Sequence, residues 1–167
     1  MEIRVLTVDD VEEYRALRLR ALREEPQAFG SSWEEESQRP PEMAIARLQS
    51  SDQTAFGGYD DNDRLVGMVW LWREGGIKSR HKGYIISMYV APEARGHGLG
   101  RKLLDAAIAR ARETPGIEQL LLAVTSINTP ARSLYLSMGF EPYGLERKAL
   151  KLGDRYLDEE LMVLFLG

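Results

Sequence analysis

The chain has 167 residues, the usual length of one domain, and its formal net charge of −4 disfavours a basic surface that binds nucleic acid. It contains no cysteine and two histidines, which excludes disulfides, iron–sulfur clusters and a cysteine nucleophile and disfavours a zinc site, so we expect no metal. The longest strongly apolar run, Leu161–Leu166, is far shorter than the ~20 residues that span a bilayer, and the N-terminal segment lacks a signal-peptide core, so we expect a cytoplasmic protein without membrane association.

Taken in chain order, the first third of the sequence predicts one strand and two helices. Glu2–Leu6 alternates between apolar and polar residues, and Thr7 and Asp10 have the spacing of a capping box at a helix start. Apolar residues then recur at helical spacing until Pro26 ends the helix. A second, short helix is expected to begin at Pro40–Pro41, because proline is well tolerated in the first turn. No element is predicted for the polar segment between these helices.

The middle of the sequence predicts three strands, a helix and a fourth strand. Thr54–Tyr59 and Leu65–Trp72 are separated by a run of Asp and Asn residues and are expected to form a hairpin. Gly83–Val90 is rich in β-branched and aromatic residues, which predicts a buried strand. Gly98–Glu113 carries its apolar residues on one helical face, and Glu118–Thr125 is almost continuously apolar, as in a strand that is covered on both faces.

A last helix and a hairpin complete the predicted order. The helix begins at Thr129–Pro130 and ends at Gly139, a strand starts after it, and Leu150–Leu166 contains a hairpin. Because the sequence has no linker or repeat, residues 1–167 are expected to form a single domain. The order βαα-βββ-αβ-αββ predicts an α/β fold with a mixed sheet.

The most informative segment is the glycine-rich turn between the buried strand and the helix that follows it. Gly96, Gly98 and Gly100 lie where backbone N–H groups converge on a helix N-terminus, which predicts a phosphate site. Their G-x-G-x-G spacing differs from the G-x-G-x-x-G of dinucleotide-binding folds, because Arg101 stands where the third glycine belongs, and it does not match the P-loop pattern. A dinucleotide-dependent enzyme and a helix start that uses glycines only for packing are the alternatives.

Charge is unevenly distributed along the chain. Residues 24–42 hold six acids and one arginine, whereas residues 95–112 hold five bases and one acid. The basic segment suits a phosphate ligand. The acidic segment suits either a solvated helix face or the attraction of a cationic ligand.

Two segments resemble the acetyl-CoA-binding motifs of the GNAT superfamily of N-acetyltransferases. Arg95-x-x-Gly98-x-Gly100 is similar to the pyrophosphate loop of that family. A second segment is similar to the family's N-x-x-A-x-x-L-Y-x-x-x-G-F motif and matches it at Asn128, Ala131, Leu134, Tyr135, Gly139 and Phe140. The resemblance covers the whole chain, since the predicted order of elements also fits the GNAT-like fold. It implies an enzyme that moves the acetyl group of acetyl-CoA directly to a primary amine.

The resemblance also implies where acetyl-CoA binds. In the family, a bulge splays the strand that corresponds to Gly83–Val90 away from the strand that corresponds to Glu118–Thr125, and pantetheine lies in the gap. Backbone groups of Met88 and Val90 would bond pantetheine and the thioester carbonyl, and amides from Gly96 to Arg101 would hold the pyrophosphate. The implied cofactor-binding residues are Met88, Tyr89, Val90, Arg95, Gly96, His97, Gly98, Leu99, Gly100, Arg101, Asn128 and Tyr135.

By the same resemblance, Tyr135 is the implied catalytic residue, and the Asn128 side chain bonds the pantetheine arm. A phenol with an unperturbed pKa near ~10 can protonate a departing thiolate, whose thiol has a pKa near ~8.5. Without the motif, Tyr135 would be interpreted as a core aromatic residue, because it shares a helical face with Ala131 and Leu134. With the motif, we expect it to be the general acid.

The sequence does not single out the base that takes a proton from the amine. The candidates are His81, His97, Glu34, Glu35, Glu36, Asp158 and Glu159.

The acidic segment favours a cationic acceptor, either a small molecule or a peptide amine. A non-catalytic module that binds acyl-CoA is the alternative function. The apolar Leu161–Leu166 strand is either sheet interior or the edge of a homodimer.

Overall fold

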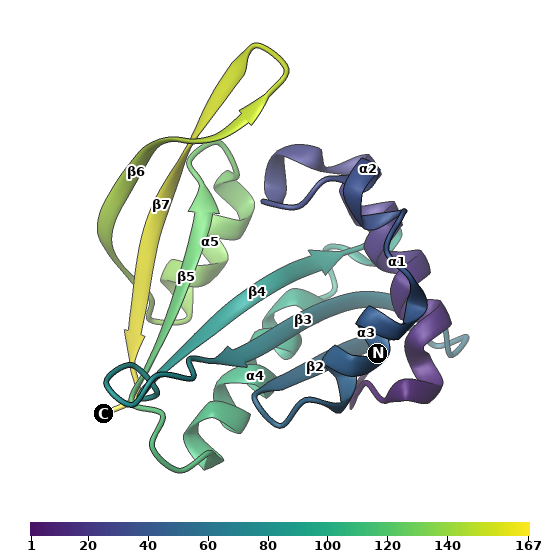
Figure 1. The fold of residues 1–167 in the computed structure, drawn as a ribbon, viewed down its shortest axis with the longest axis horizontal. Coiled ribbons are helices and arrows are strands. Elements are labelled where there is room, and N and C mark those ends of the chain that lie inside the picture. Colours follow the sequence, from purple (N-terminus) through teal and green to yellow (C-terminus); the bar gives the residue numbers. More distant parts are fainter.

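The computed structural model describes every residue from Met1 to Gly167, and its elements follow the predicted order (Figure 1). The strands are β1 (Glu2–Val5), β2 (Gln53–Tyr59), β3 (Leu65–Arg73), β4 (Lys82–Val90), β5 (Gln119–Thr125), β6 (Glu141–Leu152) and β7 (Arg155–Phe165). The α-helices are α1 (Val11–Glu24), α2 (Trp33–Glu36), α3 (Pro41–Gln49), α4 (Leu99–Glu113) and α5 (Thr129–Ser137). The mixed α/β fold is confirmed, and α2 is the one α-helix that was not predicted.

All seven strands form one sheet in the order β1-β2-β3-β4-β5-β7-β6. Neighbouring strands are antiparallel except β4 and β5, which are parallel. Of the two alternatives for Leu161–Leu166, the structure shows sheet interior for the strand residues, because β7 lies between β5 and β6. The free edges of the sheet belong to β1 and β6.

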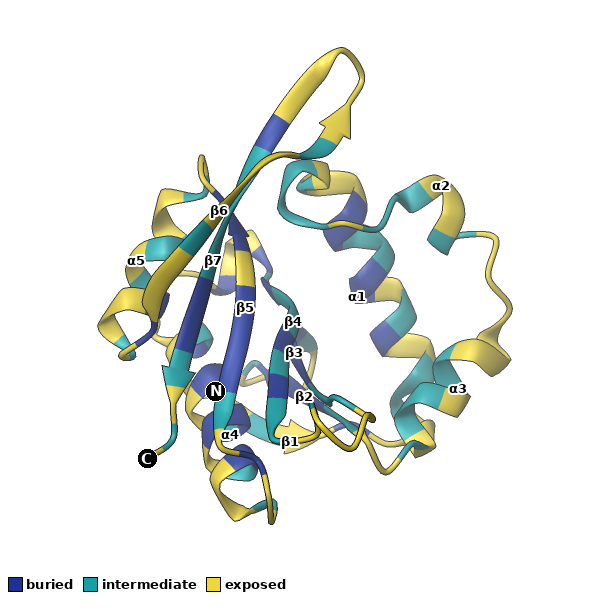
Figure 2. Ribbon diagram, turned by 60° about the vertical axis from the view of Figure 1, so that its left-hand side comes forward, coloured by how far each residue is buried: buried dark blue, intermediate teal, exposed yellow.

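Helices cover opposite faces of the sheet. The Tyr14 ring of α1 packs edge-on against Trp70 of β3, with ring centroids 5.4 Å apart. The Arg110 guanidinium of α4 lies 5.9 Å from the ring centroid of Phe56 on β2. Trp70 is paired with Ala55, the neighbour of Phe56, so Trp70 and Phe56 point to opposite faces. Figure 2 shows the buried residues along the central strands and the inner side of α1. None of the helices combines the length and the apolar character needed to cross a bilayer.

The sheet opens into a fork between β4 and β5, which diverge in Figure 1. Only Lys82, Gly83 and Tyr84 of β4 pair with β5, through Gln119, Leu120 and Leu121.

A bulge accounts for the divergence. The register between β3 and β4 shifts between Met68 and Trp70, and Ser87 of β4 has a φ of 56°, a left-handed conformation in the middle of a strand. A bulge bends its strand and increases its twist, so β4 turns away from β5 beyond Tyr84. The fork inferred from the family resemblance is therefore present.

Candidate functional site

The loop that leads from β4 into α4 presents a row of backbone N–H groups. No N–H group from Gly96 to Arg101 has a hydrogen-bond partner in the protein, and the first that has one is Lys102, which donates to the Gly98 oxygen at 3.1 Å. Gly96 and Gly98 have φ values of +79° and +78°, which side-chain-bearing residues rarely adopt. Converging amides at the start of a 15-residue helix can hold the oxygens of an anion such as pyrophosphate.

The Arg95 side chain connects this loop to β4 and to the end of α1. Its Nε donates to the Val90 oxygen at 2.9 Å, and its Nη2 pairs with Glu25 at the C-terminus of α1. The guanidinium is therefore committed to β4 and α1, and we interpret Arg95 as a residue that positions the loop. Arg101 donates from Nη1 to the Ser137 Oγ of α5 at 3.2 Å, so the loop is joined to that helix as well.

A groove of about 530 Å³ runs from this loop into the open side of the fork. Every residue predicted to bind the cofactor lines it except His97, whose side chain is exposed in the loop. Ala91 donates to Val66 of β3 at 2.8 Å, so the alternation of an antiparallel strand turns the N–H of Val90 away from β3. Met88 lies in the bulge of β4, outside the regular pairing with β3, and lines the groove.

A second cleft of about 460 Å³ lies on the other side of the fork. Its walls come mainly from β4, β5, the start of α5 and the segment that follows α1, with single side chains from α1, α3 and β6 and two from β7. Glu25, Met88, Asn128, Ala131 and Tyr135 line both this cleft and the groove. The two cavities therefore meet at Tyr135, and a ligand in one of them can touch a ligand in the other.

Tyr135 is 6% exposed and packs its ring edge-on against Phe140, with ring centroids 5.9 Å apart. None of the protein's hydrogen bonds uses its hydroxyl. Burial raises the pKa of the Tyr135 phenol, so the hydroxyl stays protonated at neutral pH and is available as a donor. Asn128 caps α5 by accepting the Ala131 N–H at 3.3 Å, and none of the protein's hydrogen bonds uses its side-chain NH₂ group.

Only two carboxylates line the cleft, those of Glu25 and Glu159. Glu25 is paired with Arg95, whereas Glu159 has no cationic partner. Glu159 lies on β7, in register with Thr125 of β5 and Glu146 of β6. Burial, and then the negative charge of Glu146, raise the pKa of the Glu159 carboxyl. A partly buried carboxylate with a raised pKa suits a general base.

The other candidate bases lie outside the cleft. His81 precedes β4 at the closed end of the fork, where its oxygen accepts from Glu118 at 2.8 Å. Asp158 accepts the Lys148 N–H at 2.8 Å within the β6–β7 hairpin. The remaining candidates, His97, Glu34, Glu35 and Glu36, also do not line the cleft.

Half of the acids in residues 24–42 are paired with arginines. Glu24 accepts from Arg20 at 2.8 Å, Glu25 pairs with Arg95, and Glu36 accepts from Arg39 at 3.0 Å. This segment therefore does not present a continuous negative surface to the cleft.

Two cleft residues, Arg18 of α1 and Arg47 of α3, were not identified from the sequence. Arg18 is 5% exposed. The sequence did contain one signal for Arg18: it lies one turn after Tyr14, on the buried face of α1.

Comparison with known proteins is consistent with this geometry. A model of the acetyltransferase (GNAT) family matches residues 18–140. Mycothiol acetyltransferase of Geodermatophilus obscurus is 31% identical over 128 residues, which are 75% of this chain and 41% of that protein. Mycothiol acetyltransferase of Thermobispora bispora is 33% identical over 135 residues, which are 78% of this chain and 43% of that protein. The chain thus matches less than half the length of these curated relatives.

Solved structures match over the full fold. Ribosomal-protein-alanine N-acetyltransferase of Brucella melitensis has a TM-score of 0.83 and 25% identity, covering 99% of this chain and 100% of that one. A protein of Salmonella typhimurium that was solved with its cofactor acetyl-CoA has a TM-score of 0.86 and 22% identity, covering 100% of this chain and 94% of that one.

Proposed function

The chain belongs to the acetyltransferase (GNAT) family, and we propose that residues 1–167 form one catalytic domain that transfers the acetyl group of acetyl-CoA directly to a primary amine. The observation that carries this proposal is the meeting of the groove and the cleft at Tyr135. A donor in the groove and an acceptor in the cleft would come together beside a buried, protonated phenol.

Acetyl-CoA fits the groove at both of its ends. The free N–H groups from Gly96 to Arg101 match the oxygens of a pyrophosphate, and the unpaired edge of β4 matches the amide groups of a pantetheine chain. Acetyl-CoA supplies the acetyl thioester. We assign the N–H groups of Met88 and Val90 to the thioester oxygen, and the Asn128 side-chain NH₂ to the pantetheine arm.

Two side chains then move protons. Glu159 takes a proton from the acceptor nitrogen, which frees its lone pair for bonding to the acetyl carbon. Tyr135 gives its proton to the sulfur as the carbon–sulfur bond breaks, and the resulting Tyr135 phenolate takes the second proton that the nitrogen loses on becoming an amide. The β4 amides stabilise the negative charge that develops on the acetyl oxygen, and removal of one such donor typically costs roughly 10²–10³ in rate.

The acceptor is a small molecule or a peptide that carries the amine. Because half of the acids in residues 24–42 are paired with arginines, we do not require the acceptor to be cationic. The mycothiol acetyltransferases match this chain over less than half of their length, so we do not transfer their acceptor to it.

A thiol-release assay tests the proposal. The protein is incubated with acetyl-CoA and a panel of amines, and free CoA and the acetylated product are measured. We expect release that depends on one class of amine. Tight binding of acetyl-CoA without CoA release from any amine would instead favour a non-catalytic acyl-CoA-binding module.

A further inference from the structure

Arg18 is a buried cation whose guanidinium lies 5.1 Å from the Phe29 ring centroid and makes no hydrogen bond to a carboxylate. Its side chain is 7% exposed, and its only ion pair joins Nε to the Glu36 Oε1 at 3.7 Å, which is too long for a hydrogen bond. Neither Nε nor Nη1 has a hydrogen-bond partner in the protein. Because a buried charge is costly unless it is paired and hydrogen-bonded, these free donors call for a ligand that accepts hydrogen bonds.

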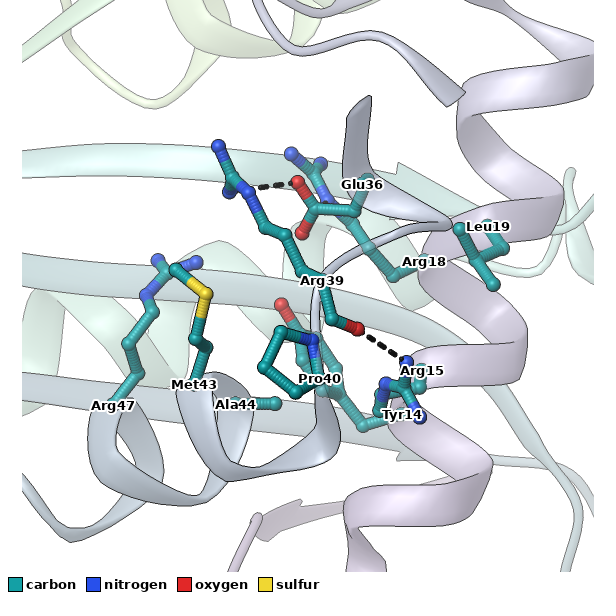
Figure 3. Close-up of a pocket in the computed structure, with 10 residues that line it drawn as sticks. All are labelled: Tyr14, Arg15, Arg18, Leu19, Glu36, Arg39, Pro40, Met43, Ala44 and Arg47. Atoms are coloured by element: carbon teal, nitrogen blue, oxygen red, sulfur yellow. Dashed lines mark hydrogen bonds and ion pairs between the residues drawn. The ribbon is translucent and has the colours of Figure 1, made fainter. Parts of the chain in front are cut away.

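The surroundings of Arg18 are strongly positive. Figure 3 shows Glu36 between the guanidinium groups of Arg18 and Arg39, with Arg47 on the next helix. Glu36 accepts from Arg39 at 3.0 Å, so its charge is shared between two arginines. Arg47 has no acidic partner: its guanidinium lies 4.4 Å from the Trp70 ring centroid, and its Nε donates to Gln53 at 3.2 Å. Three arginines and one glutamate leave an excess of positive charge.

Free donors are concentrated at this place. Besides the two nitrogens of Arg18, the buried side-chain atoms without partners are the Tyr14 hydroxyl, Trp70 Nε1 and the Thr125 hydroxyl. Tyr14 and Trp70 are in ring contact, and Trp70 lies under Arg47. Thr125 lines the cleft together with Arg18 and Arg47. The small cavity of Figure 3, about 40 Å³, holds at most a few water molecules, so a larger group must approach from the cleft.

We propose that Arg18 and Arg47 bind an oxyanion on the acceptor, so that the acceptor is an amine that also carries a carboxylate or a phosphonate-type group. This inference rests on the proposed acetyl transfer to an amine. Guanidinium groups recognise both kinds of oxyanion through paired N–H donors. The same cleft then presents Glu159 and Tyr135, the groups proposed to act in the transfer to the amine, and the arginine pair for the anion. A free amino acid has this pair of charges, whereas a polyamine would place a cation beside Arg18 and Arg47.

Matched acceptors test the inference in the thiol-release assay. The panel contains α-amino acids, their carboxamides, aminoalkylphosphonates, and simple amines and diamines of similar size. We expect kcat/KM to be roughly 10–100-fold higher for oxyanion-bearing amines than for the matched carboxamides, as for hydrogen bonds to charged groups. The ratio between amino acids and aminoalkylphosphonates identifies which oxyanion is preferred.

Two variants identify the residues responsible. Arg47→Met and Arg18→Met are expected to raise the KM of the oxyanion-bearing amine roughly 10–100-fold and to leave the KM of acetyl-CoA unchanged. Arg23→Met is the matched control, because Arg23 is an exposed arginine of α1 that does not line the cleft. Circular dichroism checks that each variant is folded, and Arg47→Met carries the test if the buried Arg18 cannot be replaced. Carboxamides or diamines that react as well as amino acids, or a preference that survives both variants, would overturn the inference.

A binding experiment separates failure of this inference from failure of the proposed function. If no amine releases CoA, acetyl transfer fails, and binding of N-acetylamino acids is then compared with binding of their amides by calorimetry. At least tenfold tighter binding of the carboxylate, lost in Arg47→Met, would support the anion site without the activity. Equal binding of both compounds would exclude the anion site.

Discussion

At the residue scale, Tyr135 presents a free hydroxyl to the junction of the two cavities. We expect Tyr135→Phe to lower kcat by roughly 10²–10⁴, because the departing thiolate loses its proton donor. The KM of acetyl-CoA and the melting temperature should change little, since none of the protein's hydrogen bonds uses this hydroxyl. Steady-state kinetics and thermal unfolding check both expectations. Unchanged turnover would show that Tyr135 is a packing residue.

If Glu159 is the general base, its protonation determines how kcat/KM falls at low pH, which is the acid limb of the pH–rate profile. Only the carboxylate form accepts a proton, so kcat/KM should fall tenfold per pH unit below the pKa of this group. That pKa is raised by burial and by Glu146, so the limb should lie above the ordinary range of glutamate. Glu159→Gln should remove the limb and lower the rate by roughly 10²–10⁴ at neutral pH.

The neighbouring carboxylate provides the control for this assignment. Glu146→Gln removes the like charge and should move the acid limb to lower pH while activity is retained. A pH–rate profile of both variants measures the shift. A limb that does not move in Glu146→Gln and persists in Glu159→Gln would belong to another group.

Sequence patterns identified some of these residues and missed others for physical reasons. Tyr135 and Asn128 belong to a contiguous motif, so their proximity to the fork follows from chain order. Glu159 was one of seven candidates, because strand pairing, which the sequence does not specify, decides which acid faces the cleft. Arg18 and Arg47 were missed because their meeting depends on how α1 packs against α3.

At the scale of elements, the loop before α4 contains two glycines, Gly96 and Gly98, that have a left-handed backbone conformation and open space around them. A Cβ at Gly98 would meet nothing within 4 Å, so its main effects are backbone strain, roughly 1–2 kcal/mol, and obstruction of the groove. We expect Gly98→Val to raise the KM of acetyl-CoA at least tenfold. Gly153→Val is the matched control, with a φ of +60° and equally open surroundings in the β6–β7 hairpin. It should lose similar stability but keep the KM of acetyl-CoA, and equal KM values in both variants would refute a binding role for the loop.

Long amphipathic or apolar segments were predicted well, and short or irregular ones were not. The 15 residues of α4 give a clear helical stripe, and β5 is apolar almost throughout. The four residues of α2 are too few for a periodic signal, since Ser32 caps a single turn. The bulge at Ser87 was inferred only from the family resemblance, because a left-handed serine inside a strand has no local sequence signature.

At the scale of the whole molecule, a ligand that bridges the two arms of the fork should stabilise the fold. At about 100 times its dissociation constant, acetyl-CoA would contribute about 2.7 kcal/mol, which corresponds to a rise in melting temperature of roughly 5–10 °C for a domain of this size. Thermal unfolding with acetyl-CoA and, as control, with NAD measures this effect. A shift with NAD and none with acetyl-CoA would revive the dinucleotide interpretation of the glycine-rich loop.

The overall charge of −4 says little about the site, because the arrangement of ion pairs decides which charges are free. From the sequence, the acidic residues of segment 24–42 were expected to attract a cationic acceptor. In the folded chain several of those acids are paired with Arg20, Arg39 and Arg95. The cleft is instead lined by Arg47 and Glu159, which have no ion-pair partner, and by Arg18, whose ion pair with Glu36 is long at 3.7 Å.

The seam, the short segment Lys82–Tyr84 where β4 pairs with β5, is the point from which the two arms of the fork diverge. A small rotation at the seam therefore moves the far ends of the arms by a larger distance. The groups proposed to act on the thioester come from both arms. Val90 lies on one arm, and Tyr135 and Glu159 lie on the other. The distance from Tyr84 to Val90 is roughly 20 Å along the strand, so a rotation of about 3° at the seam displaces the far end by about 1 Å. A displacement of that size can cost roughly 10² in rate. A methyl group at Gly83 would lie 2.8 Å from the Leu120 Cδ2, so this fully buried side chain at the seam would have to shift, and we expect a slower reaction at the other end of the strand.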